Sequence, residues 1–135
     1  MNKDKKNHRK LKRYWRLILK DRDELNYSKW KKYTWFDSLM TKSDVVNYLI
    51  NTNEELKQTY LIYQDILYSF KKKDFNKLRE TLNNINPKIS YYMKASIKNL
   101  IEFLPYIKNT FENEYHNGFI EGNNNFIKVI KRIAF

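Results

Sequence analysis

The chain has 135 residues, a formal net charge of +12 and no cysteine. This length suits one ordinary domain, and the missing thiols exclude disulfides and thiolate metal sites. No apolar run approaches the roughly 18 residues of a membrane-spanning helix, and the N-terminus lacks a signal-peptide core, so we expect a cytoplasmic protein.

Glycine and proline are scarce, with two of each in the whole chain. The chain therefore has few of the residues that hairpin turns and glycine-rich binding loops need, and this favours long helices. We predict a mainly α fold, a helical bundle or a set of helical hairpins, in which residues 1–135 form a single helical region.

The positive charge is concentrated near the N-terminus. Residues 1–33 contain thirteen Lys or Arg and four acids, whereas residues 34–114 contain eleven and ten. A concentrated basic segment attracts polyanions because binding releases counterions, so DNA is the natural partner. A solvated lysine-rich face explains the same composition, and both interpretations stay open. Binding to a membrane surface ranks below both.

Residues 3–20 predict an amphipathic helix with a basic face. Its apolar positions recur at helical spacing, at Leu11, Tyr14, Trp15 and Ile18. Another side is lined by Arg9, Arg13 and Arg16. These three arginines are therefore candidate DNA contacts.

Three acids follow that helix, namely Asp21, Asp23 and Glu24. Clustered carboxylates suggest a metal site, but no strand or glycine is available nearby to fold them around an ion. We favour a solvated turn.

An aromatic patch spans the end of the basic segment 1–33 and the residues just after it. Its members alternate with lysines and are Tyr27, Trp30, Tyr33, Trp35 and Phe36. Such aromatics stack on bases in some proteins, and in others they anchor a core beneath long lysine side chains. We favour the core role.

Residues 43–111 predict helical hairpins. Ser43 is the expected N-cap of one helix, Thr52 with Glu55 has capping-box spacing, and Asp74 caps a further helix. Pro105 is expected to end or kink the last helix. The apolar stripes include Leu56, Tyr60, Tyr63, Leu67 and Phe70, then Phe75, Leu78, Leu82 and Ile85, then Met93, Ile97, Leu100, Ile101 and Leu104. These stripes indicate core packing rather than a cofactor site.

The segment 115–135 is the stretch that most resembles a site. Asn117-Gly118 predicts a turn, and the apolar spacing after it predicts a terminal helix. Steps of three or four residues place four polar side chains on one face of that helix, namely Glu121, Asn125, Lys128 and Arg132. The helix macrodipole by itself also favours an acid at a helix start. We interpret His116 as a turn residue.

Two runs of sequence resemble a known family. NGFIEGNNNFIKVIKR, from Asn117 to Arg132, with YMKASIKNLIEFLPYIKNTF before it, from Tyr92 to Phe111, is similar to the C-terminal part of ISL-three family transposases. HRKLKRYWRLILKDRDEL, from His8 to Leu25, resembles the basic helical region of the same family. The resemblance implies a DDE enzyme, in which two aspartates on an RNase H-like sheet and one glutamate on a later helix hold Mg²⁺ or Mn²⁺ for DNA cleavage and strand transfer.

By this resemblance Glu121 matches the third catalytic acid and metal ligand, and Lys128 matches a basic residue that faces the DNA backbone. Lys131 and Arg132 are further candidate DNA contacts. No convincing β-run with an aspartate occurs in the first hundred residues. The resemblance therefore implies the helical insertion of the family plus its glutamate helix, with the sheet largely absent.

The leading hypothesis is a truncated bacterial transposase that is inactive alone and holds no metal tightly, located in the cytoplasm and on the nucleoid when bound to DNA. The alternative is a non-catalytic DNA-binding or regulatory module that associates or competes with the full-length transposase. A third possibility is a helical domain without autonomous function that self-associates through apolar faces.

Overall fold

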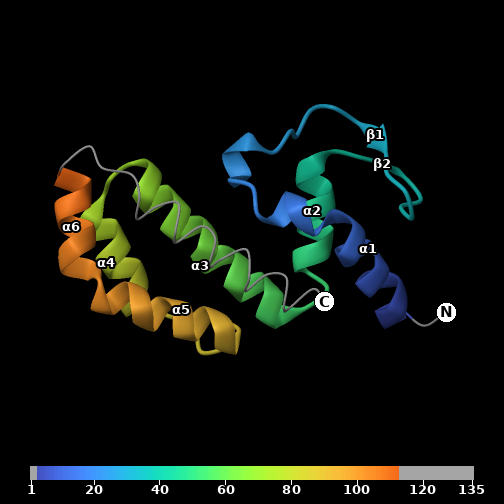
Figure 1. The fold of residues 1–135 in the computed structure, drawn as a ribbon. Helices are drawn as coiled ribbons and strands as arrows, with labels where there is room; N and C mark the ends of the chain where they lie inside the picture. The colour runs from blue at the N-terminus through green and yellow to red at the C-terminus, as the bar shows by residue number, and fades with distance from the viewer. Residues whose placement is uncertain (1–2, 113–135) are drawn as a thin grey trace.

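The structure is a computed structural model and describes residues 3–112. In order along the chain the elements are α1 (Lys3–Ile18), the short 3-10 helix η1 (Arg22–Glu24), β1 (Lys31–Lys32), β2 (Leu39–Met40), α2 (Lys42–Ile50), α3 (Glu54–Lys71), α4 (Phe75–Asn83), α5 (Tyr91–Glu102) and α6 (Leu104–Glu112). The predicted mainly α fold is confirmed (Figure 1). No helix in the described part of the chain is long and apolar enough to cross a bilayer.

Helix α3 runs between two groups of elements (Figure 1). Its first turns, with Leu56 and Tyr60, pack in one hydrophobic cluster together with α1 and α2. The rest of α3, including Ile66, packs in a second cluster with α4 and α5. One continuous helix therefore contributes to both clusters.

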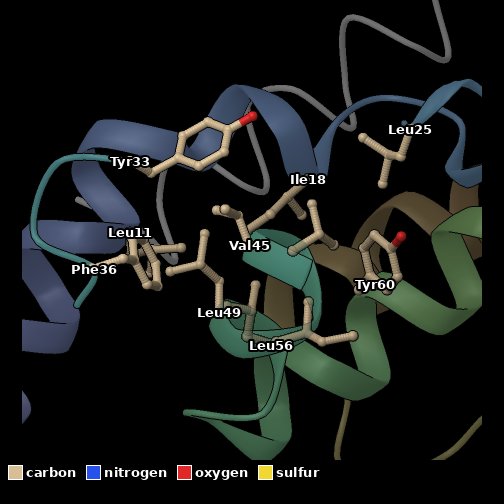
Figure 2. Packing of buried hydrophobic residues seen from close by; sticks show 11 residues of the cluster. Leu11, Ile18, Leu25, Tyr33, Phe36, Val45, Leu49, Leu56 and Tyr60 are labelled. Atoms are coloured by element: carbon tan, nitrogen blue, oxygen red, sulfur yellow. The ribbon is translucent and has the colours of Figure 1, made fainter. Parts of the chain in front are cut away.

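The first cluster fixes the position of α1 (Figure 2). Leu11, near the middle of that helix, and Ile18, its last residue, are buried in one cluster with Val45 and Leu49 of α2. Ile18, Val45 and Leu49 have no exposed surface. Burying side chains of this size contributes about 1.5–3 kcal/mol each, so the polar side of α1 is left facing solvent.

Two helix starts differ from the predicted caps. Thr41, not Ser43, caps α2, because its side chain accepts from the Asp44 N–H while the Asp44 carboxylate accepts from the Thr41 N–H. Asn53, not Thr52, caps α3. The Thr52 hydroxyl instead donates to the Leu49 carbonyl at the end of α2, at 2.6 Å. Neighbouring residues with equivalent capping chemistry compete, and the course of the backbone selects one.

The predicted hairpin of α3 and α4 is confirmed, with Asp74 as the N-cap of α4. Lys73 has a left-handed φ of 52°, the Asp74 N–H donates to the Ser69 carbonyl, and the Lys73 N–H donates to the Phe70 carbonyl. This pair of bonds is a Schellman motif, which satisfies the last carbonyls of a helix. It reverses the chain within three residues without a glycine.

The prediction for Pro105 is also confirmed. Helix α5 starts after the N-cap Ser90 and ends at Glu102, and Pro105 lies in the first turn of α6. Proline is tolerated there because a first-turn N–H has no partner within the helix.

The short β-hairpin is the part of the fold that the glycine count did not predict. Lys31 pairs with Met40 and Lys32 with Leu39 in a two-stranded antiparallel sheet. The connecting loop contains Trp35 with a φ of 71°, the left-handed region that glycine usually occupies. Tryptophan thus occupies a turn position that usually takes glycine, which costs roughly 1–2 kcal/mol of conformational free energy.

Side chains of α3 hold the chain that leaves α1. The Tyr63 hydroxyl donates to the Leu19 carbonyl at 2.9 Å. Burial, and to a lesser degree the charge of Asp21, raises the pKa of Tyr63 to about 12. Lys71 lies 3.4 Å from an Asp21 carboxylate oxygen, an ion pair that is partly exposed and therefore contributes little. The end of α1 is thus tied to the helix that both clusters share.

Candidate nucleic-acid interface

Helix α1 presents a row of arginines to solvent. Arg9, Arg13 and Arg16 are all exposed and follow each other at steps of four and three residues. Leu11 and Ile18 are buried on the other side of the same helix. The predicted basic face is therefore present as a surface feature, and each arginine is positioned by the packing of α1 on α2.

Two of these arginines converge on Trp35. The Arg9 guanidinium carbon lies 4.4 Å from the centre of the Trp35 ring, and that of Arg13 lies 5.7 Å away. Arg16 instead lies over the Trp15 ring, at 5.5 Å. Cation-π contacts of this kind contribute about 0.5–1 kcal/mol at exposed sites. They stack the planar guanidinium on the ring, and its N–H donors lie in the guanidinium plane. The aromatic rings thus orient the arginine row.

The loop around Trp35 is anchored on both sides. The Tyr14 hydroxyl donates to the Thr34 carbonyl at 2.9 Å, and the Phe36 N–H donates to the Tyr33 carbonyl at 3.1 Å. Tyr33 and Phe36 are buried, and burial, then the neighbouring Tyr14, raises the pKa of Tyr33. Trp35 itself stays 43% exposed between these anchors. The fold therefore holds an indole ring outside the core.

A surface pocket of about 290 Å³ lies at this place, lined by Lys6, Arg9, Lys10, Trp35 and Asp37. The Lys10 ammonium lies 4.7 Å from the Phe36 ring and 4.5 Å from the Tyr48 ring, and donates to the Tyr48 hydroxyl. Three cations and one carboxylate thus surround an aromatic wall. This combination suits an anionic ligand that also has a flat face.

The predicted core role of the aromatic patch is only half right. Tyr33 and Phe36 are in the core, whereas Tyr27, Trp30 and Trp35 are 81%, 63% and 43% exposed. Periodicity did not separate the two groups, because a two-residue strand and an irregular loop carry these positions. The alternation of aromatics with lysines was the signal for an exposed role.

The acidic residues after α1 form a turn, as expected. The Asp21 carboxylate accepts from the Asp23 N–H at 3.0 Å, and both aspartates face Lys71. Among residues 3–112 no group of three His, Cys, Asp or Glu side chains is arranged to hold a metal ion. Residues 3–112 therefore do not provide the group of carboxylates that would hold the Mg²⁺ or Mn²⁺ of DDE chemistry.

A second pocket, of about 350 Å³, lies between α3 and α4, lined among others by Gln58, Asp65, Lys77 and Glu80. Its charges are mixed, and it lies on the α4 side of α3, away from the arginine row. It offers no reactive constellation.

A profile of transposases of the DDE class, ISL-three type, matches residues 1–135. The chain belongs to this family. Membership places DNA as the substrate of the family and divalent metal ions as its usual cofactors. The remaining site residues predicted for this ISL-three transposase chain, Glu121, Lys128, Lys131 and Arg132, lie outside the described residues.

The transposase chain is also similar to a Lactococcus lactis subsp. lactis protein named "ATP-dependent protease", with 36% identity over 96 residues. The alignment covers 71% of this chain and 31% of that protein, so the chain spans about a third of its relative's length. No solved structure matches the transposase chain.

Proposed function

We propose that this chain is a DNA-binding helical region of an ISL-three transposase, which contacts the DNA backbone through Arg9, Arg13 and Arg16. The single observation that carries the proposal is the exposed arginine row on α1, oriented by Trp35 and Trp15. Oriented guanidinium groups match phosphate geometry and lose little freedom on binding. Neutralising phosphates releases counterions, which supplies most of the affinity for DNA without regard to sequence.

We further propose that Glu121 descends from the third catalytic acid and metal ligand, and that Lys128, Lys131 and Arg132 contact DNA beside it. Two-metal phosphoryl transfer needs several carboxylates in one place. Residues 3–112 do not assemble such a group. In this proposal the chain is a truncated transposase that does not cleave DNA alone, and the metal is held only with the aspartates of a full-length parent.

The same arginine surface supports a second candidate, a regulatory module that competes with a full-length transposase for DNA. The two candidates share the DNA contact and differ only in whether the chain influences the parent enzyme. Association with that enzyme, self-association, and a cytoplasmic or nucleoid location remain predictions.

The name of the Lactococcus relative suggests a different activity, which we do not propose for this chain. ATP hydrolysis by a P-loop needs the pattern Gly-x-x-x-x-Gly-Lys, and the two glycines of this chain, Gly118 and Gly122, are spaced four apart and followed by Asn123. The transposase profile covers all 135 residues, whereas the alignment reaches only 31% of the protein that carries that name.

The test is binding to a fluorescent blunt 20-bp duplex, measured by anisotropy between 50 and 250 mM salt. The triple variant Arg9→Gln, Arg13→Gln, Arg16→Gln is expected to weaken binding and to reduce the slope of log K against log salt by about 2–3, close to one per lost phosphate contact.

A matched control neutralises three exposed lysines in and just before α5, namely Lys88, Lys94 and Lys98. It removes the same charge and is expected to leave the slope almost unchanged. Equal losses in the two triple variants would mean that net charge, not the α1 surface, governs binding. Binding that does not depend on salt would overturn the proposal.

A further inference from the structure

The side chain of Trp35 is more exposed, and its main chain is more strained, than contact with the DNA backbone requires. A phosphate contact needs only the cations of α1. Yet the loop between β1 and β2 holds Trp35 at a φ of 71°, which costs a non-glycine residue roughly 1–2 kcal/mol. The loop also keeps that ring partly exposed rather than buried.

Trp35 remains 43% exposed with Arg9 and Arg13 over its ring, so an incoming flat group is able to reach this side chain. Every nucleobase has a π-face, and base–aromatic stacking contributes about 1–3 kcal/mol per base. In a duplex the faces of the bases are stacked on each other, so a base reaches an aromatic wall only when it is unpaired.

The pocket beside the ring provides the rest of a nucleotide site. Its volume of about 290 Å³ is near the lower end for small-ligand pockets, which suits one nucleotide rather than a stretch of several. Lys6 and Arg9, both from α1, line the pocket and attract the phosphate. Asp37, which also lines the pocket, repels a phosphate and is able to accept hydrogen bonds from exocyclic amines of bases, so the base end is expected towards Asp37.

We propose that the pocket formed by Lys6, Arg9, Lys10, Trp35 and Asp37 binds one unpaired DNA nucleotide, with its base stacked on Trp35 and its phosphate held by Lys6 and Arg9. This inference rests on the proposed function and adds a substrate feature to it. The chain prefers DNA with an unpaired base next to a duplex over fully paired DNA.

The experiment compares the blunt duplex with the same duplex carrying a three-nucleotide single-stranded extension, at one fixed salt concentration. The wild-type chain is expected to bind the extended duplex about 5- to 30-fold more tightly. Trp35→Ala is expected to abolish that preference, so that its affinities for the two duplexes become equal; it also weakens binding to both, because the Trp35 ring orients Arg9 and Arg13. Trp35→Phe, which keeps an aromatic ring, is expected to keep part of the preference. The matched control is Trp30→Ala, which removes another exposed tryptophan of the same segment and is expected to keep the full preference.

A second measurement does not depend on how Trp35→Ala folds. In the variant Trp15→Phe, Trp30→Phe the fluorescence of Trp35 is observed alone, and the extended duplex is expected to quench it more than the blunt duplex. Equal affinity for the two duplexes, or equal quenching by them, overturns this inference and leaves the proposed function standing. Absence of salt-dependent binding to either duplex is a failure of the proposed function itself.

Discussion

The side chain of Gln64 on α3 joins the backbone on both sides of the turn after α1: its Nε2 donates to the Lys20 carbonyl at 2.9 Å, and its Oε1 accepts from the Arg22 N–H at 3.0 Å. Gln64 is 2% exposed. A buried amide thus satisfies a carbonyl that follows the end of α1 and the first N–H of η1, groups that have no partner within a helix. Through this amide, together with Tyr63, α1 and its arginine row are held on the central helix.

Replacing Gln64 by Ala is therefore expected to destabilise the protein by about 2–4 kcal/mol, because two partly buried backbone groups lose their partners. Urea unfolding followed by circular dichroism measures this change. Gln58→Ala is the control, since the Gln58 amide reaches only the exposed Glu54 carboxylate on its own helix, and it should cost less than about 0.5 kcal/mol. Similar costs for the two variants would contradict the role given to Gln64.

Stability should fall as the pH rises from 10 to 12. The pKa of Tyr63 is raised from 10.0 to about 12, first by burial, and burial raises the pKa of Tyr60 and Tyr33 as well. Above pH 10 the unfolded chain releases these protons while the folded chain retains them, so the unfolded state binds fewer protons and gains stability relative to the folded state. Below pH 10 both states are protonated and this contribution is fully present.

The variant Tyr63→Phe tests the assignment of that pH dependence. It removes one of the shifted groups, so the alkaline loss of stability should be less steep, as measured by thermal unfolding at pH 9 to 12. At neutral pH it should cost about 1 kcal/mol, because the hydrogen bond to the Leu19 carbonyl is lost. Identical alkaline slopes in wild type and variant would refute the assignment.

Lys73→Gly should stabilise the protein. Lys73 adopts a left-handed φ of 52° after α3, where glycine avoids the clash of a side chain with the backbone. The expected gain is about 0.5–1 kcal/mol in urea unfolding, smaller than the full strain because glycine also gains entropy in the unfolded chain. The neighbouring variant Lys72→Gly should instead destabilise the protein, since Lys72 has right-handed helical geometry. A loss of stability in Lys73→Gly would argue against the Schellman ending of α3.

No strand cleavage is expected from this chain alone. Duplexes that carry transposon ends are incubated with Mg²⁺ or Mn²⁺ and analysed on denaturing gels, with DNA binding measured in the same samples to establish that the protein is competent. The physical reason is that one acid at Glu121 cannot position two metal ions without further carboxylates. Metal-dependent nicking that disappears in Glu121→Gln would show that the chain is an active nuclease.

The sequence by itself determined the helices, the family and the arginine row. Helical periodicity placed Leu11 and Ile18 on one side of α1 and Arg9, Arg13 and Arg16 on another, because the 3.6-residue repeat is a local property of the chain. The seam of α3 and the cap at Asp74 followed from equally local chemistry.

Only the tertiary structure decided which aromatics leave the core and where they meet the arginines. Trp35 is 22 residues from Arg13 in sequence, and their contact depends on a loop that returns across α1 with a backbone conformation unusual for tryptophan. The choice of Thr41 and Asn53 over equally suitable neighbours as caps likewise depended on the path of the chain between helices. Local pattern specifies which residues are able to form an element, whereas burial and long-range contacts select among alternatives of similar local energy.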